Sequence, residues 1–222
     1  MTKRIKTHLF QLPVEEFANT LTHGVGFLLS LLGFFALVAL SWIHGDPIVI
    51  FGSVVYGISL VVLYGASTVY HSVTSYRAKK NLQIVDHCCI YLLIAGSYTP
   101  FGLVIAVDDF GRNLFLAVWA FAVIGIVIKL IIRDRWPALN VISYLAMGWL
   151  GVFAVQPLWQ ILGVMPVVLT IAGGVAYSLG VIFFPWKSIK HHHAIFHIFI
   201  LAGSIIHFAA VILYVIPHAA NL

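Results

Sequence analysis

The chain has 222 residues, of which 62% are hydrophobic and 9% are charged, and its mean hydropathy is +1.05. A soluble domain carries about 25% charged residues, so this composition excludes a water-soluble fold. The formal net charge is +5, and the basic residues are scattered among short segments between apolar runs. This scatter gives no support to a nucleic-acid partner, since attraction to the anionic headgroups of membrane lipids explains it.

Apolar runs of about 20 residues, long enough to cross a bilayer as helices, repeat along the whole chain. The expected helices cover residues 20–42, 48–72, 82–106, 114–132, 139–156, 162–184 and 193–216. The predicted fold is therefore all-α, a seven-transmembrane-helix bundle that forms a single domain over residues 1–222. The first 19 residues carry charges of both signs and no short apolar core, so we expect no cleavable signal peptide.

Lysine and arginine are distributed unevenly between the two sets of loops. Arg112 falls in a loop of one set. The other eleven of the twelve basic residues fall in the second set: Lys3, Arg4, Lys6, Arg77, Lys79, Lys80, Lys129, Arg133, Arg135, Lys187 and Lys190. Loops rich in Lys and Arg stay in the cytoplasm. We therefore expect the N-terminus inside, the C-terminus outside and a multi-pass protein of the plasma membrane, which is the inner membrane in a bacterium.

Three histidines, a carboxylate and a hydroxyl are expected at one membrane depth. His193 and His197 open the last helix and share a face, because residues four apart are neighbours on a helix. His71 ends the second helix on the same side, four residues after Ser67, and Asp86 begins the third helix. Ionisable side chains in membrane helices are costly and mark functional candidates. The topology therefore predicts one site built from three helices.

The chemistry of this set suits zinc. Neutral imidazole nitrogen is a good Zn²⁺ ligand, and three protein ligands, here His71, His193 and His197, leave a fourth position for water. Zinc lowers the pKa of such a water to about 7. Asp86 would orient that water or take its proton. Ser67 would donate a hydrogen bond to the water or to a developing oxyanion, or orient His71. The alternative is that these polar groups only bond one another and tie the helices together.

Other polar residues admit two interpretations. Glu16, Asn19 and His23 share a helix face at the start of the first apolar run. They either line the entrance of the site or form the polar face of an interfacial helix. His207 lies 14 residues after the first histidine of the pair, about 21 Å deeper at 1.5 Å per residue. It either lines a pocket or contacts a neighbouring helix. His87 is expected to face away from the site.

Several segments carry a specific resemblance to a known family. They are residues 16–24 (EFANTLTHG), 67–71 (STVYH), 85–100 (VDHCCIYLLIAGSYTP), 144–149 (YLAMGW) and 193–197 (HAIFH), followed by His207 and Phe208. Together they resemble the haemolysin III family, the bacterial branch of the progestin and adipoQ receptor family, along essentially the whole chain. The resemblance implies a seven-helix protein with its N-terminus inside and a zinc ion near the cytoplasmic surface. It further implies a zinc ligand set of His71, His193 and His197, with Asp86 and Ser67 at the family's Asp and Ser positions.

The wider superfamily that this resemblance points to includes alkaline ceramidases. The expected function is therefore a zinc-dependent, ceramidase-like hydrolase of membrane lipid amide or ester bonds, acting in membrane lipid or fluidity homeostasis. The alternative is a non-enzymatic receptor or regulator of membrane state with a structural zinc. Structural zinc usually has four protein ligands, which favours the enzyme. A pore-forming haemolysin is suggested only by the family name.

Overall fold

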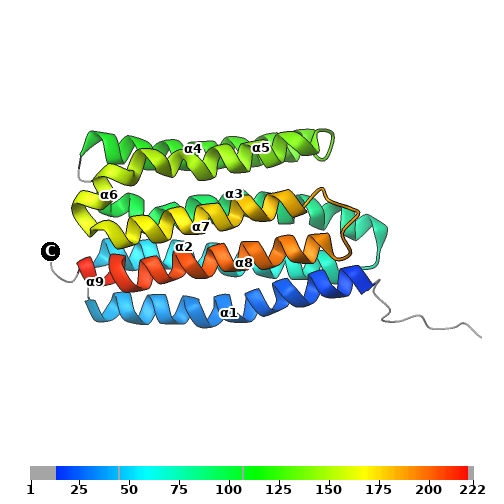
Figure 1. Cartoon of the computed structure of the whole chain (residues 1–222), viewed down its shortest axis with the longest axis horizontal. Helices are drawn as coiled ribbons and strands as arrows, with labels where there is room; N and C mark the ends of the chain where they lie inside the picture. Colours follow the sequence, from blue (N-terminus) through cyan, green and yellow to red (C-terminus); the bar gives the residue numbers. More distant parts are fainter. Residues whose placement is uncertain (1–13, 45, 107, 220–222) are drawn as a thin grey trace, which may run out of the picture.

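The structure, a computed structural model, describes residues 14–44, 46–106 and 108–219, which form helices and no strand (Figure 1). The helices are α1 (Val14–His44), α2 (Pro47–Ser72), α3 (Tyr76–Ile105), α4 (Asp109–Ile132), α5 (Pro137–Gly148), α6 (Val155–Leu162), α7 (Val164–Phe183), α8 (His192–Ala210) and α9 (Ile216–Ala219). A 3-10 segment, η1 (Trp149–Ala154), precedes α6, and a π-helical segment, η2 (Val211–Val215), follows α8. Within the described residues, 7 helical stretches are long and apolar enough to cross a membrane. The predicted all-α seven-helix bundle is confirmed.

Several helices extend beyond the predicted apolar runs. α1 begins at Val14 instead of residue 20, and α3 and α4 begin at Tyr76 and Asp109 instead of residues 82 and 114. Asn19, in the added part of α1, is buried, so a polar residue there still packs inside the bundle. Hydropathy therefore underestimates these helices. The predicted span 139–156 continues through η1 and α6 to Leu162, which shortens the helix that follows.

Aspartate side chains fix the beginnings of α2 and α4. Asp46 Oδ1 accepts hydrogen bonds from the backbone N–H groups of Ile48 (2.7 Å) and Val49 (3.3 Å). Asp108 Oδ1 accepts one from the N–H of Gly111 (2.7 Å). These N–H groups have no acceptor within the helix, so the caps stabilise each helix start, by about 1 kcal/mol for a typical cap.

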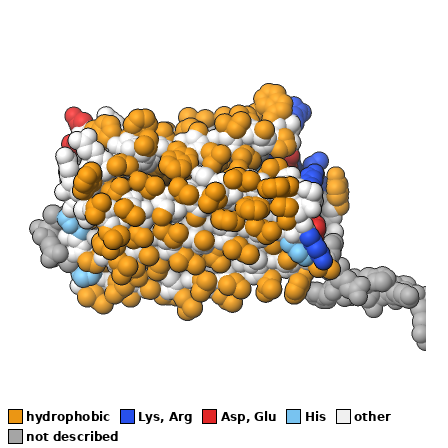
Figure 2. All heavy atoms as spheres, viewed as in Figure 1, with side chains coloured by type: hydrophobic (Ala, Val, Ile, Leu, Met, Phe, Trp, Pro, Cys, Tyr) orange, Lys and Arg blue, Asp and Glu red, His pale blue; other side chains and the backbone are white. Residues whose placement is uncertain are grey.

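The helices run roughly side by side along the bundle (Figure 1). α4 and α5 form the outer pair at the top of the view, while α3 lies inside and packs against α2 and α4. α2 and α3 are the most buried spans. Apolar side chains cover the visible face between the two ends of the bundle in Figure 2. Such a surface is suited to lipid acyl chains and not to water.

One end of the bundle, called the basic end below, carries most of the positive charge of the described residues. It is the end where α1, α3, α5 and α8 begin, and it carries Arg77, Lys79, Lys80, Lys129, Arg133, Arg135, Lys187 and Lys190. Lys and Arg spheres gather at that end in Figure 2. Arg112 lies near the start of α4, at the opposite end. Lys3, Arg4 and Lys6 lie outside the described residues, and the cytoplasmic location of the basic end stays a prediction.

Candidate metal centre

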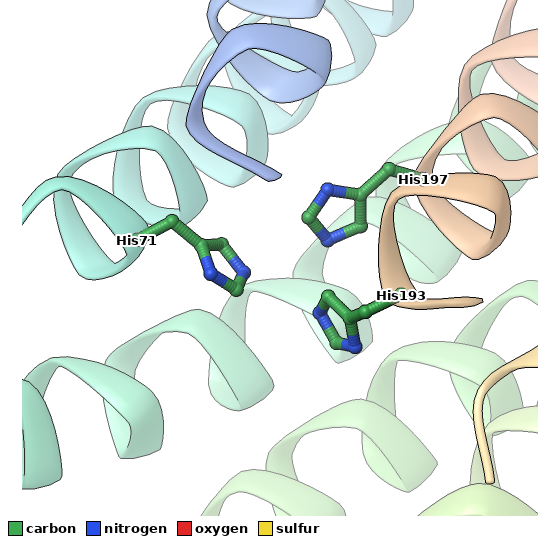
Figure 3. Close-up of side chains that lie close together, drawn as sticks. All are labelled: His71, His193 and His197. Carbon is green, nitrogen blue, oxygen red and sulfur yellow. The ribbon is translucent and has the colours of Figure 1, made fainter. Parts of the chain in front are cut away.

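Three histidine side chains from two helices meet at the basic end. His71 lies in the last turn of α2, and His193 and His197 lie in the first two turns of α8. One ring nitrogen from each of the three histidines can serve as a ligand, and these three nitrogens lie within 4.8 Å of one another. The group could therefore hold a metal ion. Figure 3 shows the three side chains converging from the two helices. The fold therefore brings together the three residues that spacing and topology predicted.

Hydrogen bonds fix which nitrogen is free on two of these rings. Nδ1 of His71 donates to Oε2 of Glu16 (2.7 Å). The hydroxyl proton of Thr22 is directed to backbone carbonyls three and four residues earlier, so its oxygen accepts from Nδ1 of His197 (3.1 Å). Nε2 of each ring therefore keeps its lone pair. Nε2 of His71 is buried without a hydrogen-bond partner among the described residues. Together with His193, these nitrogens form a donor set that fits zinc or a similar transition metal.

Glu16 also connects the histidine cluster to the start of α3. Its Oε2 atom lies 3.1 Å from Nζ of Lys79, and Lys79 donates a hydrogen bond to the backbone oxygen of Tyr70 (3.2 Å). The side chain of Lys79 also lies over the ring of Tyr70. Glu16 thus links α1, α2 and α3 around His71. Of its two interpretations from sequence, the structure supports a place at the site.

His23 of α1 stacks on His197, with ring centroids 3.4 Å apart, and meets Tyr64 edge-on at 5.1 Å. Both ring nitrogens of His23 are buried and make no hydrogen bond with the described residues. Asn19, one turn earlier, is buried as well. The two residues therefore face the bundle interior beside the histidine cluster and do not form an exposed interfacial face.

A cavity of about 290 Å³ lies inside the bundle beside the histidines. Its walls include His193, His197, Asp86 and Ser67. Asp86 is 8% exposed and Ser67 is 1% exposed. Asp86 is not one of the groups within the 4.8 Å cluster. Asp86 therefore lines the cavity without belonging to the histidine cluster, and the catalytic roles of Asp86 and Ser67 stay predictions.

Away from the cluster, the cavity is lined mainly by apolar side chains, including Ile105, Leu158 and Val167. His207 lines it too, ten residues beyond His197 and so about 15 Å further along α8. Nε2 of His207 donates to the backbone oxygen of Thr170 (2.9 Å). His207 therefore contacts a neighbouring helix and also lines the pocket, which combines its two interpretations from sequence.

Three residues that sequence reasoning missed lie in the same region. His87, expected to face away, lines the cavity together with Asp86. The side chains of consecutive helix residues point about 100° apart. The cavity nevertheless reaches the side chains of both Asp86 and His87. Asn140 of α5 also lines it. Lys129 is 1% exposed, and its Nζ lies 2.5 Å from Oδ1 of Asp134. Its position within an apolar run was the signal that could have singled it out from the loop charges.

The fold and the site define a class of protein: a membrane protein of seven helices with a cluster of three histidines, two of them fully buried, beside an internal, mainly apolar cavity. Residues 11–208 match the family described as Haemolysin-III related. The chain belongs to this family, and the resemblance predicted from its motifs is confirmed.

Known relatives cover nearly the full chain. The chain is 39% identical to Hemolysin-3 of Bacillus cereus over 220 residues, which are 99% of this chain and 100% of that protein. It is 42% identical to the Hemolysin-3 homolog of Bacillus subtilis (strain 168) over 200 residues, 90% of this chain and 94% of that protein. The human Monocyte to macrophage differentiation factor is 27% identical over 205 residues, 89% of this chain and 83% of that protein.

Proposed function

We propose that the protein is a zinc-dependent hydrolase of amide or ester bonds in membrane lipids and acts in membrane lipid or fluidity homeostasis in the plasma membrane. One observation carries the proposal: a cluster of three histidines and a buried carboxylate, Asp86, adjoin one internal cavity whose remaining walls are mainly apolar. A cavity that is polar at one end and apolar along its length fits an amphipathic molecule. In a membrane, that molecule is a lipid.

Each residue at the polar end has a role in this proposal. A divalent ion held by the histidines would polarise a carbonyl oxygen and activate water for attack. Glu16 keeps the proton of His71 on Nδ1, which orients that ring. Asp86 accepts the proton of the attacking water and returns it to the leaving nitrogen or oxygen. Ser67 donates a hydrogen bond to the oxygen that gains charge. Water is added across the acyl bond, and a fatty acid and an amine or alcohol are released.

The competing function is a receptor or regulator of membrane state. The contacts of Glu16 with His71 and Lys79 support it, because a metal ion held by the histidine cluster would also tie several helix ends together. Under that function, Asp86 has no chemical role and its replacement leaves the phenotype intact. A pore-forming lysin is a third candidate, which the name of the Bacillus relatives suggests. Ion flux through liposomes that contain the purified protein tests it.

The hydrolase is tested directly with purified, zinc-loaded protein in lipid nanodiscs. Ceramides, N-acyl amines and acylglycerols with a common acyl chain are supplied, and released fatty acid is measured by mass spectrometry. We expect turnover of at least one lipid class and its loss in His197→Ala. Thr20→Ala serves as the control variant, because its hydroxyl bonds only the backbone of its own helix. No release from any lipid amide or ester, in protein shown to contain metal, would overturn the proposal.

A further inference from the structure

The polar side chains that line the cavity differ in whether they already have hydrogen-bond partners. Tyr98 donates its hydroxyl proton to the backbone oxygen of Gly148 (2.6 Å). Thr170 and Ser178 each donate to the backbone carbonyl four residues earlier, at 2.7 and 2.8 Å. Because their donors are used within the protein, these walls offer little to a polar ligand. They are suited to contact with an acyl chain.

The side chains of His87 and Asn140 are different. Both line the cavity, and neither makes a hydrogen bond that meets normal geometry within the described part of the chain. Asn140 is 8% exposed, and a buried amide without a partner costs free energy. Buried Asn140 and half-buried His87 therefore keep side-chain polar atoms in the cavity wall that are available to a ligand.

The packing of α3 against α5 brings these two residues to the same place. The hydroxyl of Tyr144 donates to the backbone oxygen of His87 (3.0 Å). Asn140 lies four residues before Tyr144 and shares its helix face. His87 in turn follows Asp86 directly. The pair therefore lies next to the proposed catalytic carboxylate, on α3 and α5, whereas the histidine cluster comes from α2 and α8.

A partly buried ion pair, Lys129–Asp134, lies beside the ring of His87. Nδ1 of His87 lies 3.6 Å from Oδ1 of Asp134, and the same oxygen lies 2.5 Å from Nζ of Lys129. The carboxylate favours the tautomer with the proton on Nδ1, so Nε2 keeps a lone pair and acts as an acceptor. Asn140 offers both an acceptor and donors. The two residues, together with the carboxylate of Asp86, are richer in acceptors than in donors.

The charges around the cavity also restrict which lipid headgroups it can bind. Its lining residues include no lysine or arginine within the described part of the chain. The positive charge of Lys129 is already paired with Asp134. Apart from the metal ion proposed at the histidine cluster, no lining side chain would supply a cation to a phosphate group beside Asp86, and burying an unpaired anion is costly. A head that carries hydroxyl or amine protons instead finds the acceptors that it needs.

We propose that His87 and Asn140 form a headgroup subsite that determines specificity. It binds lipids with a hydroxyl- or amine-bearing head and rejects lipids with a phosphate head. The assignment rests on the proposed function for its occupant, a membrane lipid, but it concerns recognition and not bond cleavage. It can therefore be tested with lipids that cannot be hydrolysed.

The test measures binding of two ether lipids to zinc-loaded protein in detergent micelles. The probes are 1-O-octadecylglycerol and its 3-phosphate, which share one alkyl chain and have no acyl bond. Affinities come from displacement of a fluorescent fatty alcohol. We expect the wild-type protein to bind the neutral lipid at least about tenfold more tightly, which corresponds to roughly 1.4 kcal/mol. Similar affinities for the two probes would overturn the subsite.

Three variants locate the preference. Asn140→Leu and His87→Phe should each weaken binding of the neutral lipid about tenfold and leave the phosphate lipid unchanged, since each removes hydrogen bonds that only the neutral head makes. Asn140→Lys should reverse the preference by supplying a cation. Asn113→Leu, at an exposed position of α4, is the control and should match the wild type. Circular dichroism in the same micelles checks that each variant is folded. Equal weakening of both probes in Asn140→Leu and His87→Phe would contradict the assignment.

The proposed headgroup subsite and the proposed hydrolase function can be contradicted independently of each other. A headgroup preference that Asn140→Leu removes, in a protein that cleaves no lipid, supports the subsite and contradicts the hydrolase. Lipid hydrolysis with a headgroup preference that Asn140→Leu and His87→Phe leave unchanged supports the hydrolase and contradicts the subsite.

Discussion

Oε2 of Glu16 lies 2.7 Å from Nδ1 of His71 and joins the first helix of the bundle to the histidine cluster. Carboxylates that accept from the far nitrogen of a metal-binding histidine fix its tautomer and its orientation. Here the acceptor comes from α1, a helix that contributes no histidine to the cluster. The metal affinity of the protein should therefore depend on a residue that does not touch the metal.

Glu16→Ala should lower zinc affinity about 10- to 100-fold, the usual effect of removing such a partner. Glu16→Gln should retain part of the affinity, because its amide oxygen still accepts from Nδ1. Competition with a chromogenic chelator measures the dissociation constants. Glu15→Ala is the matched control, since the neighbouring Glu15 is exposed. Equal affinities for wild type and Glu16→Ala would show that the contact does not support the metal site.

Metal removal should destabilise the wild-type protein. A ligand present at a thousandfold excess over its dissociation constant stabilises the folded state by about 4 kcal/mol. A chelator should therefore lower the unfolding temperature in detergent, and added zinc should restore it. His193→Ala should unfold at a temperature that neither chelator nor zinc changes. A chelator effect of the same size in that variant would place the bound metal elsewhere.

The substitution Asp86→Asn distinguishes the proposed hydrolase function from the competing regulator function. The substitution keeps the size of the side chain and removes its capacity to accept a proton. Turnover should fall about 100- to 10,000-fold, the usual contribution of a general base, while zinc content stays at the wild-type level. The measurement is fatty acid release alongside metal analysis of the same preparation. Undiminished turnover would remove Asp86 from the mechanism.

Neighbouring glycines of α7 offer a test of the packing around His207. A methyl group at position 173 would collide with the imidazole of His207, whereas one at position 174 meets nothing within 4 Å. Gly173→Ala should therefore destabilise the protein by about 1–3 kcal/mol, as overpacking does. Gly174→Ala should be neutral or stabilising, by up to about 1 kcal/mol from helix propensity. Denaturation in mixed micelles measures both. The opposite order would mean that α7 and α8 pack differently.

The predicted orientation is tested by labelling in intact cells. With both native cysteines replaced, Lys190→Cys introduces a thiol at an exposed position of the basic end, and Asp109→Cys introduces one at an exposed position of the other end. A maleimide that cannot cross membranes should label only the thiol at residue 109, because basic loops stay in the cytoplasm. Labelling of residue 190 instead would reverse the topology.

The sequence by itself determined the seven helices, because a bilayer demands apolar segments of a set length. It also predicted the approach of His71 to His193 and His197. Helix periodicity and alternating topology set the depth of a residue without knowledge of packing. Its errors lay at helix ends, where polar residues such as Asn19 continue a helix inside the bundle.

Only the tertiary structure decided which side chains touch. The bonds from Glu16 to His71 and from Thr22 to His197, and the place of His87 in the cavity, depend on how each helix is rotated about its axis. That rotation comes from interdigitating side chains of several helices at once. Hydropathy fixes how deep a residue lies in the membrane, and packing fixes which neighbour it faces.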